Sequence, residues 1–362
     1  MTPPGPDTAD RHAPAAARLA IPDTVLAQLE AHGLAVSDTL ERVEVKLHEQ
    51  ARSSHAFVDQ AARYLISAGG KRFRPLMVAL AGHLGPDGAD GAGARQRDEL
   101  VDAGVIVELV HLATLYHDDV IDEATARRGA PSANSRWDNT VAILTGDYLF
   151  ACASALSAEL GVEVTRIMAS TLAELCEGQI REVQGSMSAL LPDVPTVDPT
   201  LDHYLEVVSG KTASLIATSC RYGALLSGVA PDGVEAAARY GWNVGVAFQL
   251  SDDILDIASD HEDSGKTPGT DLREGVRTLP VLYALEQEPD GELAGLLDGP
   301  ALGDDEVARA LELLRASDAL ARARASAGEY VAAAVAELER FGDRPIVSAL
   351  TRLAEYALHR AG

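Results

Sequence analysis

The sequence of 362 residues has little cysteine and few aromatic side chains. Only 3 residues are cysteine and 4% are aromatic. Sheet proteins favour aromatic and β-branched residues, whereas this chain is rich in alanine, the strongest helix former. Cys152, Cys176 and Cys220 form no CxxC pair, and their odd number indicates reduced thiols in the core of a cytoplasmic protein. We therefore expect a helical protein without disulfides.

Basic residues and long apolar runs are also scarce. The chain has 30 Lys and Arg against 55 Asp and Glu, a net charge of −25, which excludes a binder of nucleic acid because such proteins need a basic surface. No apolar run reaches the roughly 18 residues of a membrane-spanning helix, and no integral membrane segment is expected. The first residues lack the basic and apolar segments of a secretion signal. Any anion site must be locally basic or bridged by metal.

Helical periodicity recurs from about residue 22 onward, interrupted by short segments rich in Gly and Pro. We predict helices near 56–68, 75–85, 98–126, 138–159, 161–186, 202–227, 231–258, 278–288, 304–315, 318–340 and 344–360. Residues 1–20 are typical of a disordered Pro/Ala tail. Since no linker divides residues 21–362, the sequence predicts one all-α domain there. It contains no βαβ alternation, GxGxxG or Walker motif, which argues against dinucleotide and P-loop sites.

Two apolar helical runs, HLATLYHDDVID (111–122) and VGVAFQLSDDILD (244–256), each end in DDxxD. Helix geometry places the first and last aspartate of each motif about 40° apart on one face, with the middle one flanking it. Carboxylates this close repel one another unless a cation joins them, and Mg²⁺ does so while also contacting phosphates. A solvated acidic face explains one such cluster more easily than two. The six aspartates are Asp118, Asp119, Asp122, Asp252, Asp253 and Asp256.

The scarce basic residues gather around these clusters. GGKRFRP (69–75) is a Gly-rich turn before a helix start, His111 lies two turns before Asp118 on the same face, and a long polar loop, 259–275, follows the second cluster. Taken singly, each basic residue also fits an ordinary surface or core position. Together they predict a site for two polyphosphate groups. They are Lys71, Arg72, Arg74, His111, Arg127, Arg128, Lys211 and Lys266.

In this order the motifs resemble those of the trans-isoprenyl diphosphate synthases, also called the polyprenyl synthetase family. The similarity covers about residues 50–290 through GGKRFRP, HLATLYHDDVIDEATARRG, GDYLFA, GKTASL, FQLSDDILD and GKTPGTDLREGVRTLP, and residues 304–360 match only loosely. The resemblance implies antiparallel helices around a deep central cavity, usually in a homodimer. It also implies head-to-tail condensation of an allylic diphosphate with isopentenyl diphosphate.

The resemblance further implies roles for individual residues. Three Mg²⁺ would join the allylic diphosphate to Asp118 and Asp122 on one side and Asp252 on the other, supported by Asp119, Asp253 and Asp256. The allylic diphosphate would be held by Arg127, Lys211 and Lys266, and the isopentenyl diphosphate by Lys71, Arg74, His111 and Arg128. Thr212 and Gln249 would line the reaction centre, and Arg72 would be auxiliary, shaping the turn.

Product length is expected to depend on the helical turns before Asp118. In the family, bulky aromatics four or five residues before the motif stop growth early, and here those positions are Thr114 and Ala113. With Leu109 they are predicted to form the floor of the cavity, which favours medium or long products, C30 to C50, of the quinone side-chain type. The alternatives are a short-chain geranylgeranyl or farnesyl diphosphate synthase and a non-catalytic partner subunit. A terpene cyclase would not need GGKRFRP.

Overall fold

The computed structural model describes Leu34 and residues 36–86, 93–186, 197, 199–259, 268–298 and 302–359. The predicted tail 1–20 and Lys266 lie outside these residues. The described helices are α2 (Val36–Gln50), α3 (Ala56–Ala62), α4 (Tyr64–Ser67), α5 (Phe73–Gly82), α7 (Ala94–Ile121), α8 (Ala133–Arg136), α9 (Asn139–Leu160), α10 (Val162–Ser186), α11 (Leu201–Val208), the π-helical η4 (Ser209–Ala213), α12 (Ser214–Leu226), α13 (Pro231–Ala258), α14 (Thr270–Arg273), α15 (Leu279–Gln287), α16 (Glu292–Leu297), α17 (Asp304–Ala316), α18 (Ala319–Leu338), the 3₁₀ turn η5 (Glu339–Phe341) and α19 (Pro345–His359).

The described strands form a single short hairpin, in which β1 (Ala126–Arg127) pairs antiparallel with β2 (Ala130–Pro131). Everything else regular in the described part of the chain is helical, so the predicted all-α fold class is confirmed. A single domain over residues 21–362 stays a prediction.

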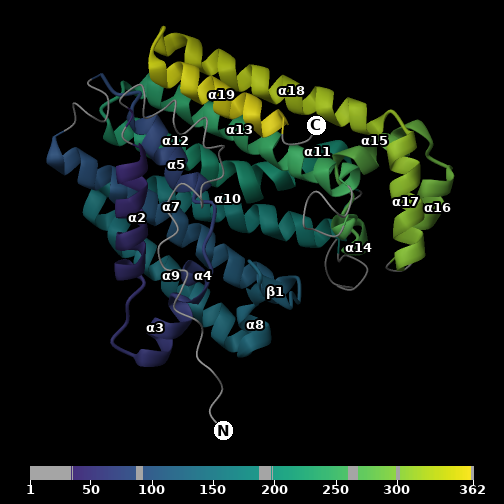
Figure 1. The fold of residues 1–362 in the computed structure, drawn as a ribbon, viewed down its shortest axis with the longest axis horizontal. Helices are drawn as coiled ribbons and strands as arrows, with labels where there is room; N and C mark the ends of the chain where they lie inside the picture. The colour runs from purple at the N-terminus through teal and green to yellow at the C-terminus, as the bar shows by residue number, and fades with distance from the viewer. Residues whose placement is uncertain are drawn as a thin grey trace.

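Helix α7 is enclosed by its neighbours, packing against α2, α5, α9 and α12 (Figure 1). Because it is covered on several sides, nearly every residue from Leu100 to Ala113 is buried, and its apolar residues are not confined to one stripe. Its last turn carries the first aspartate cluster. Burial of the helix thus holds this cluster in place at the end of α7.

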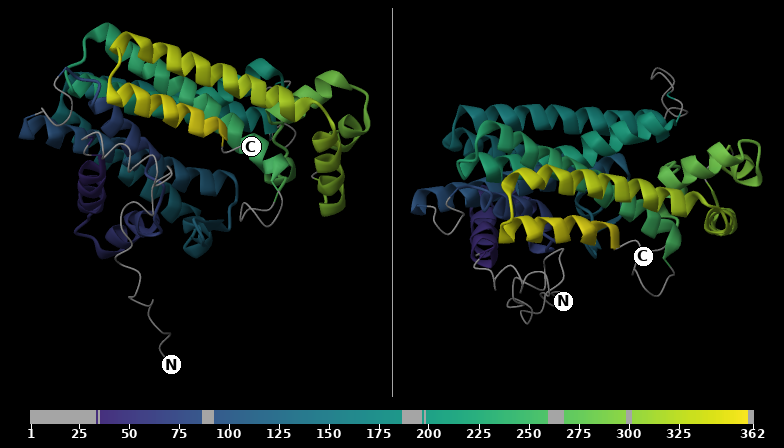
Figure 2. Two further views of the ribbon diagram at one scale, coloured as in Figure 1. Left: turned by 45° about the horizontal axis from the view of Figure 1, so that its top comes forward. Right: turned by 90° about the horizontal axis from the view of Figure 1, so that it is seen from above.

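The second aspartate cluster ends α13, which packs between α12 on one side and α18 and α19 on the other. Figures 1 and 2 show α18 and α19 running side by side along α13, with α16 and α17 at one end of the molecule. Helix α12 also contacts α5, α7 and α10, so it links the two halves of the helical array. The two long helices that carry the clusters are therefore held through a common neighbour.

The structure differs from the predicted helix pattern in several places. Helices α2, α8, α14 and α16 were not predicted, although α2 buries Val36, Leu40, Val43 and Leu47 at helical spacing. The predicted helix 98–126 ends earlier, at Ile121, before the hairpin. The predicted helix 56–68 is divided at Arg63 into α3 and α4. The predicted helix 202–227 contains the π-helical turn η4, and such turns are frequent at functional sites.

Helices α7 and α9 are long and apolar enough to cross a membrane by length and composition alone. No such helix was expected from the sequence. The most apolar window of α7 is 72% buried, as in a core helix, whereas that of α9 is only 39% buried. On α9, Ile143 and Leu144 remain 43% and 61% exposed. Helix α9 thus presents an apolar face that the described chain leaves exposed.

Candidate active site

The two aspartate clusters converge on one site. Asp118 lies on the last turn of α7, Asp122 caps that helix, and Asp256 lies on the last turn of α13. Lys211 interacts electrostatically with both Asp118 and Asp122. Glu274, which follows α14, interacts with Asp122 and Asp256. The two helix ends therefore face a common space between η4 and α14.

Asp118 and Asp122 are partly withdrawn from water, which disfavours their charged forms. Burial raises the pKa of Asp118 to about 6, the Lys211 ammonium opposes this, and repulsion from Asp122 adds to it. Burial also raises the pKa of Asp122. A cation bound between the two carboxylates would relieve both effects. This pair therefore fits a divalent metal with oxygen ligands.

Two of the aspartates assigned supporting positions hold protein groups in place. Oδ1 of Asp119 accepts a hydrogen bond from Nε of Arg127 at 2.6 Å, and the Asp119 side chain is fully buried. The carboxylate of Asp256 accepts the backbone N–H groups of Thr270 at 3.1 Å and Asp271 at 3.2 Å. Asp119 thus orients the arginine predicted to bind diphosphate, and Asp256 anchors the start of α14.

The third supporting aspartate, Asp253, ends a chain of hydrogen bonds that starts in η4. Thr212 Oγ1 donates to Gln249 Oε1 at 3.1 Å, and Gln249 Nε2 donates to Asp253 Oδ1 at 2.8 Å. The hydroxyl of Tyr204 on α11 donates to Oδ2 of the same carboxylate. Burial raises the pKa of Asp253 to about 7, against the two hydrogen bonds that lower it. Tyr204 and Asp253 therefore fix the rotamer of Gln249, and through it the Thr212 hydroxyl.

Lys211 lies in η4 and forms an ion pair with Glu182 on α10. Burial favours the neutral amine, but Glu182 and Asp118 outweigh this effect and raise the pKa of Lys211. The ammonium therefore stays charged beside the first aspartate cluster. Glu182 holds it there, next to the position predicted for the allylic diphosphate.

Two glycines determine where η4 lies. A Cβ atom on Gly178 of α10 would be 2.6 Å from the backbone nitrogen of Lys211, and one on Gly210 would be 2.8 Å from Cα of Gly178. Backbone therefore packs directly on backbone where α10 meets η4. Any side chain at Gly178 would push Lys211 and Thr212 away from the aspartates.

Arg74, Arg128 and His111 form a second basic group near the turn at 69–75. Nε of Arg74 is buried without a hydrogen-bond partner among the described residues, and burial lowers the pKa of Arg74 to about 10. Burial also lowers the pKa of Arg128. Burial and these arginines lower the pKa of His111 well below 6.5, so its imidazole is neutral. Crowded, under-paired cations of this kind fit an anion with several oxygens.

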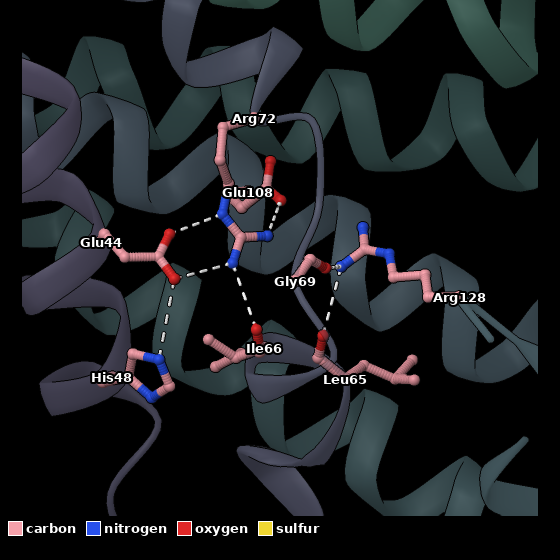
Figure 3. Close-up of polar contacts among 8 residues, drawn as sticks. All are labelled: Glu44, His48, Leu65, Ile66, Gly69, Arg72, Glu108 and Arg128. Carbon is pink, nitrogen blue, oxygen red and sulfur yellow. Dashed lines mark hydrogen bonds and ion pairs between the residues drawn. The ribbon is translucent and has the colours of Figure 1, made fainter. Parts of the chain in front are cut away.

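Arg72, in the same turn, contacts two carboxylates (Figure 3). Its Nε donates to Glu44 Oε2 at 2.7 Å, and its Nη1 donates to Glu108 Oε1 at 2.8 Å. Its Nη2 donates to the carbonyl of Ile66 at 3.3 Å. Because its guanidinium contacts two carboxylates, Arg72 shapes the turn, as predicted from the sequence, and does not line the cavity described next.

Beside it, Nη1 of Arg128 donates to the carbonyls of Leu65, at 3.2 Å, and Gly69 (Figure 3). Arg72 and Arg128 both have positive φ angles, 46° and 54°, which non-glycine residues rarely adopt. These strained backbones are held by the buried hydrogen bonds that the two side chains make. The turn and Arg128 are thus preorganised relative to each other.

A cavity of about 410 Å³ runs between α7, α9, α10 and η4. Its lining includes the polar residues Arg74, His111, Asp118, Lys211 and Thr212. It also includes the apolar residues Phe150, Leu172 and Leu175. The structure thus brings charged residues predicted from distant motifs into one cavity, together with apolar side chains.

Of the three predicted floor residues, only Thr114 lines this cavity. Ala113 and Leu109 are fully buried in the hydrophobic core instead. Helix geometry explains the difference: Thr114 lies about 40° from Asp118 around α7, whereas Ala113 and Leu109 lie about 140° and 180° away. Lys71 is exposed at the turn and is not part of the cavity lining.

Sequence reasoning missed Glu44, Glu108, Gly178, Glu182 and Tyr204, which support the site from other elements. Their partners lie at least 28 residues away in the sequence. Glu108 carried the one usable signal, a charged residue inside an otherwise apolar helix. The others have no local signature.

Comparisons with known proteins show what the chain is similar to. Residues 55–314 match the family described as polyprenyl synthetase. The nonaprenyl diphosphate synthase of Mycobacterium tuberculosis is 47% identical over 330 residues, 91% of this chain and 94% of that protein. The heptaprenyl diphosphate synthase component 2 of Geobacillus stearothermophilus is 37% identical, over 82% of this chain and 88% of that protein. The polyprenyl synthase of Caulobacter crescentus, solved with calcium and isoprenyl diphosphate, has a TM-score of 0.78 at 33% identity, covering 94% of this chain and 98% of that one.

Proposed function

The chain belongs to the polyprenyl synthetase family and is a medium- to long-chain trans-prenyltransferase, and we propose that it extends an allylic diphosphate with isopentenyl diphosphate to products of C30 to C50. The observation that carries this proposal is the cavity of about 410 Å³, which is lined both by Asp118, Lys211 and Arg74 and by the apolar side chains of Phe150, Leu172 and Leu175. The charged residues suit a diphosphate, and the apolar ones suit a prenyl chain.

The enzyme uses divalent metal, and we propose that this metal is Mg²⁺, three ions per site. Asp118, Asp122 and Asp252 would hold it. Within the described residues no three His, Cys, Asp or Glu side chains lie close enough to form a metal site by themselves. This fits Mg²⁺, which takes one or two carboxylates and completes its shell with water and phosphate oxygens. Bound there, the metal would neutralise charge that develops on the leaving diphosphate.

In this proposal, different basic residues bind each of the two substrates. Lys211 and Arg127, held by Glu182 and Asp119, contact the allylic diphosphate and stabilise it as the C–O bond breaks. Lys266 is proposed to join them. Arg74, Arg128, His111 and Lys71 hold the isopentenyl diphosphate.

The second substrate is then placed so that its double bond attacks the allylic cation. Thr212, oriented by Gln249, presents its oxygen to the developing positive charge. Loss of a proton, accepted by the departing diphosphate, restores the double bond. Proximity of the two bound substrates replaces any need for a nucleophilic side chain.

We also propose a homodimer formed through the apolar face of α9 and α10. Ile143 and Leu144 on α9 and Ile180 on α10 are 43%, 61% and 60% exposed. Ile180 also lines the cavity, so a partner on this face would close the chamber on that side. Leu144→Glu is expected to give monomers in sedimentation velocity, and an unchanged dimer would contradict this interface. A cytoplasmic location, with Cys152, Cys176 and Cys220 reduced, is proposed as well.

The test of the function is direct. Purified protein is incubated with labelled isopentenyl diphosphate, Mg²⁺ and a series of allylic primers, and the products are sized by chromatography. We expect elongation that depends on Mg²⁺ and stops between C30 and C50. Products of C15 or C20 alone would favour the short-chain alternative. No elongation with any primer would overturn the proposal that this chain is active by itself, and would favour a subunit that needs a partner.

A further inference from the structure

Beyond the cavity just described, α7, α10 and α12 surround a second, smaller void. It has no room for a water molecule and is lined by Ile106, Val107 and Val110 of α7, Met168 and Thr171 of α10, and Leu215, Thr218 and Tyr222 of α12. No residue lines both spaces. A layer of side chains therefore separates them.

The void continues the cavity along three helices at once. On α7 the lining passes from Thr114 to Val110 and Val107, and on α10 from Leu175 and Leu172 to Thr171 and Met168. These are steps of three and four residues, so each helix keeps the same face toward the path. Thr114 and Val107 are about 10 Å apart along the axis of α7.

On the third side the path runs from Thr212 in η4 to Leu215, Thr218 and Tyr222 of α12. Residues that line a void lack contacts on one side, and methionine rearranges easily, so the side chains between the cavity and the void can shift to admit an advancing apolar chain.

On the side of α10 and α12 the void is bounded by a hydrogen-bonded pair of threonines. The Oγ1 atoms of Thr171 and Thr218 are 2.6 Å apart, and Thr171 Oγ1 also donates to the carbonyl of Ile167 at 2.9 Å. Thr218 must then be the donor within the pair, so both hydroxyls are satisfied. The two residues are 4% and 6% exposed. They form a polar bridge between α10 and α12 inside an apolar core.

The same two threonines also line a groove on the other side. This groove, of about 430 Å³, is open to solvent and includes Ile167, Ala217 and Trp242. Thr171 and Thr218 line both the void and the groove. The pair is therefore the wall between the inner path and the surface.

We propose that the Thr171–Thr218 pair is the stop that sets product length. An apolar chain end that reaches it meets two side chains bonded to each other. Passing between them would leave a buried hydroxyl without a partner, which is unfavourable. Growth ends there, at a depth well beyond Thr114. This inference rests on the proposed prenyl transfer and identifies the residues that limit its product.

The test removes the wall and, separately, fills the void. Thr171→Ala, Thr218→Ala and the double variant are expected to shift the longest product upward by at least one isoprene unit, most in the double variant. Val110→Phe is expected to shift it downward. Products are sized with excess isopentenyl diphosphate, and the rate of the first condensation is measured separately, because the wall should not affect that step.

Matched controls use residues equally buried on the same helices. Ser219 on α12 bonds the carbonyl of Leu215 at 2.7 Å and does not line the void, and Val105 on α7 lies in the core on the opposite face. Ser219→Ala and Val105→Phe should leave product length unchanged. If the alanine double variant does not fold, Thr171→Val with Thr218→Val keeps the side-chain volume and removes the hydrogen bond, and it too should lengthen the product.

The two possible failures are distinguishable. If the unmodified enzyme extends no primer, the proposal that this chain is active by itself is overturned. The stop is overturned, while the function stands, if the unmodified enzyme elongates but the folded threonine variants make products of the same lengths. It is also overturned if Ser219→Ala shifts product length as much as the threonine variants do.

Discussion

Nη1 of Arg72, in the turn before α5, donates to Oε1 of Glu108 in the middle of α7 at 2.8 Å, and the two residues are only 7% and 1% exposed. Glu108 also interacts electrostatically with Arg74 and Arg128. One buried carboxylate therefore anchors the turn and balances the positive charges of Arg74 and Arg128. The proposed diphosphate-binding group thus depends on a residue that does not line the cavity.

Glu108→Gln should therefore weaken both stability and substrate binding. Removing one partner of a buried ion pair costs about 3–5 kcal/mol, because the other charge is left uncompensated. We expect a lower melting temperature and a KM for isopentenyl diphosphate raised more than the KM for the allylic primer. Glu99→Gln, which removes an exposed helix-surface partner of Arg95 on the same helix, is the control. Equal effects of Glu108→Gln on both KM values would contradict the assignment.

A second prediction concerns the glycine contact behind Lys211. In Gly178→Ala the new Cβ would stand 2.6 Å from the Lys211 nitrogen, a backbone atom that cannot move without η4. We expect kcat to fall at least tenfold, because the ammonium and Thr212 move together. Gly295→Ala, where a Cβ meets nothing within 4 Å, should keep full activity and gain up to about 1 kcal/mol of stability. Steady-state kinetics and thermal melting of both variants separate these effects.

These residues show what the sequence alone could provide. The aspartate motifs, the arginine turn and Lys211 were predictable, since their chemistry lies in short segments at helical spacing. The supporting partners were not, because Glu44, Glu182 and Tyr204 are ordinary residues until the fold brings them to the site. Such contacts depend on how helices pack, which local periodicity does not specify.

The floor residues show a different limit. Ala113 and Leu109 were counted by distance from the motif, whereas the face of α7 decides which side chains enter the cavity. The 3.6-residue period alone would have separated them from Thr114. The path beyond Thr114 required α10 and α12, and their position relative to α7 could not be predicted from the sequence.

This distinction can be tested with two neighbouring substitutions. Thr114→Phe places a ring in the cavity and should shorten the dominant product while the enzyme remains folded. Ala113→Phe places the same ring in a fully buried core position, where overpacking costs about 1–3 kcal/mol, and should act mainly on stability. Product sizing and thermal melting are the readouts. If the Ala113→Phe enzyme folds and gives shorter products, Ala113 does form part of the cavity floor, which would contradict this assignment.

A fourth prediction follows from the neutral state of His111. Burial and the positive charges of Arg74 and Arg128 lower its pKa well below 6.5, whereas the unfolded chain keeps that ordinary value. As the pH falls below 6.5 the unfolded state binds a proton that the folded state does not, so the histidine destabilises the fold progressively. The limiting slope is about 1.4 kcal/mol per pH unit.

His111→Gln removes this term, while the carboxylates whose pKa values are raised remain in both proteins. The difference in unfolding free energy, unmodified protein minus variant, should therefore decrease as the pH is lowered from about 7.5 to about 5. Urea titrations at several pH values measure it. A difference that is independent of pH would show that the imidazole is not held neutral.

The last prediction concerns the hydrogen bonds from Tyr204 to the reaction centre. Tyr204→Phe keeps the ring and removes the hydroxyl that donates to Asp253, which in turn accepts from Gln249. Without that donor the buried carboxylate of Asp253 has one hydrogen bond fewer. The Gln249 amide then loses its fixed orientation, and so does the Thr212 hydroxyl, which donates to Gln249 Oε1.

We expect kcat to fall about tenfold, since positioned dipoles act mainly in the transition state, while both KM values change little. Tyr283→Phe removes a hydroxyl that bonds Ser326 away from the site and controls for loss of a tyrosine hydroxyl elsewhere in the fold. Gln249→Ala should lower kcat similarly, and the double variant should be no worse than the more impaired single variant if the residues act as one chain. Independent, additive losses would mean that Tyr204 acts on Asp253 alone.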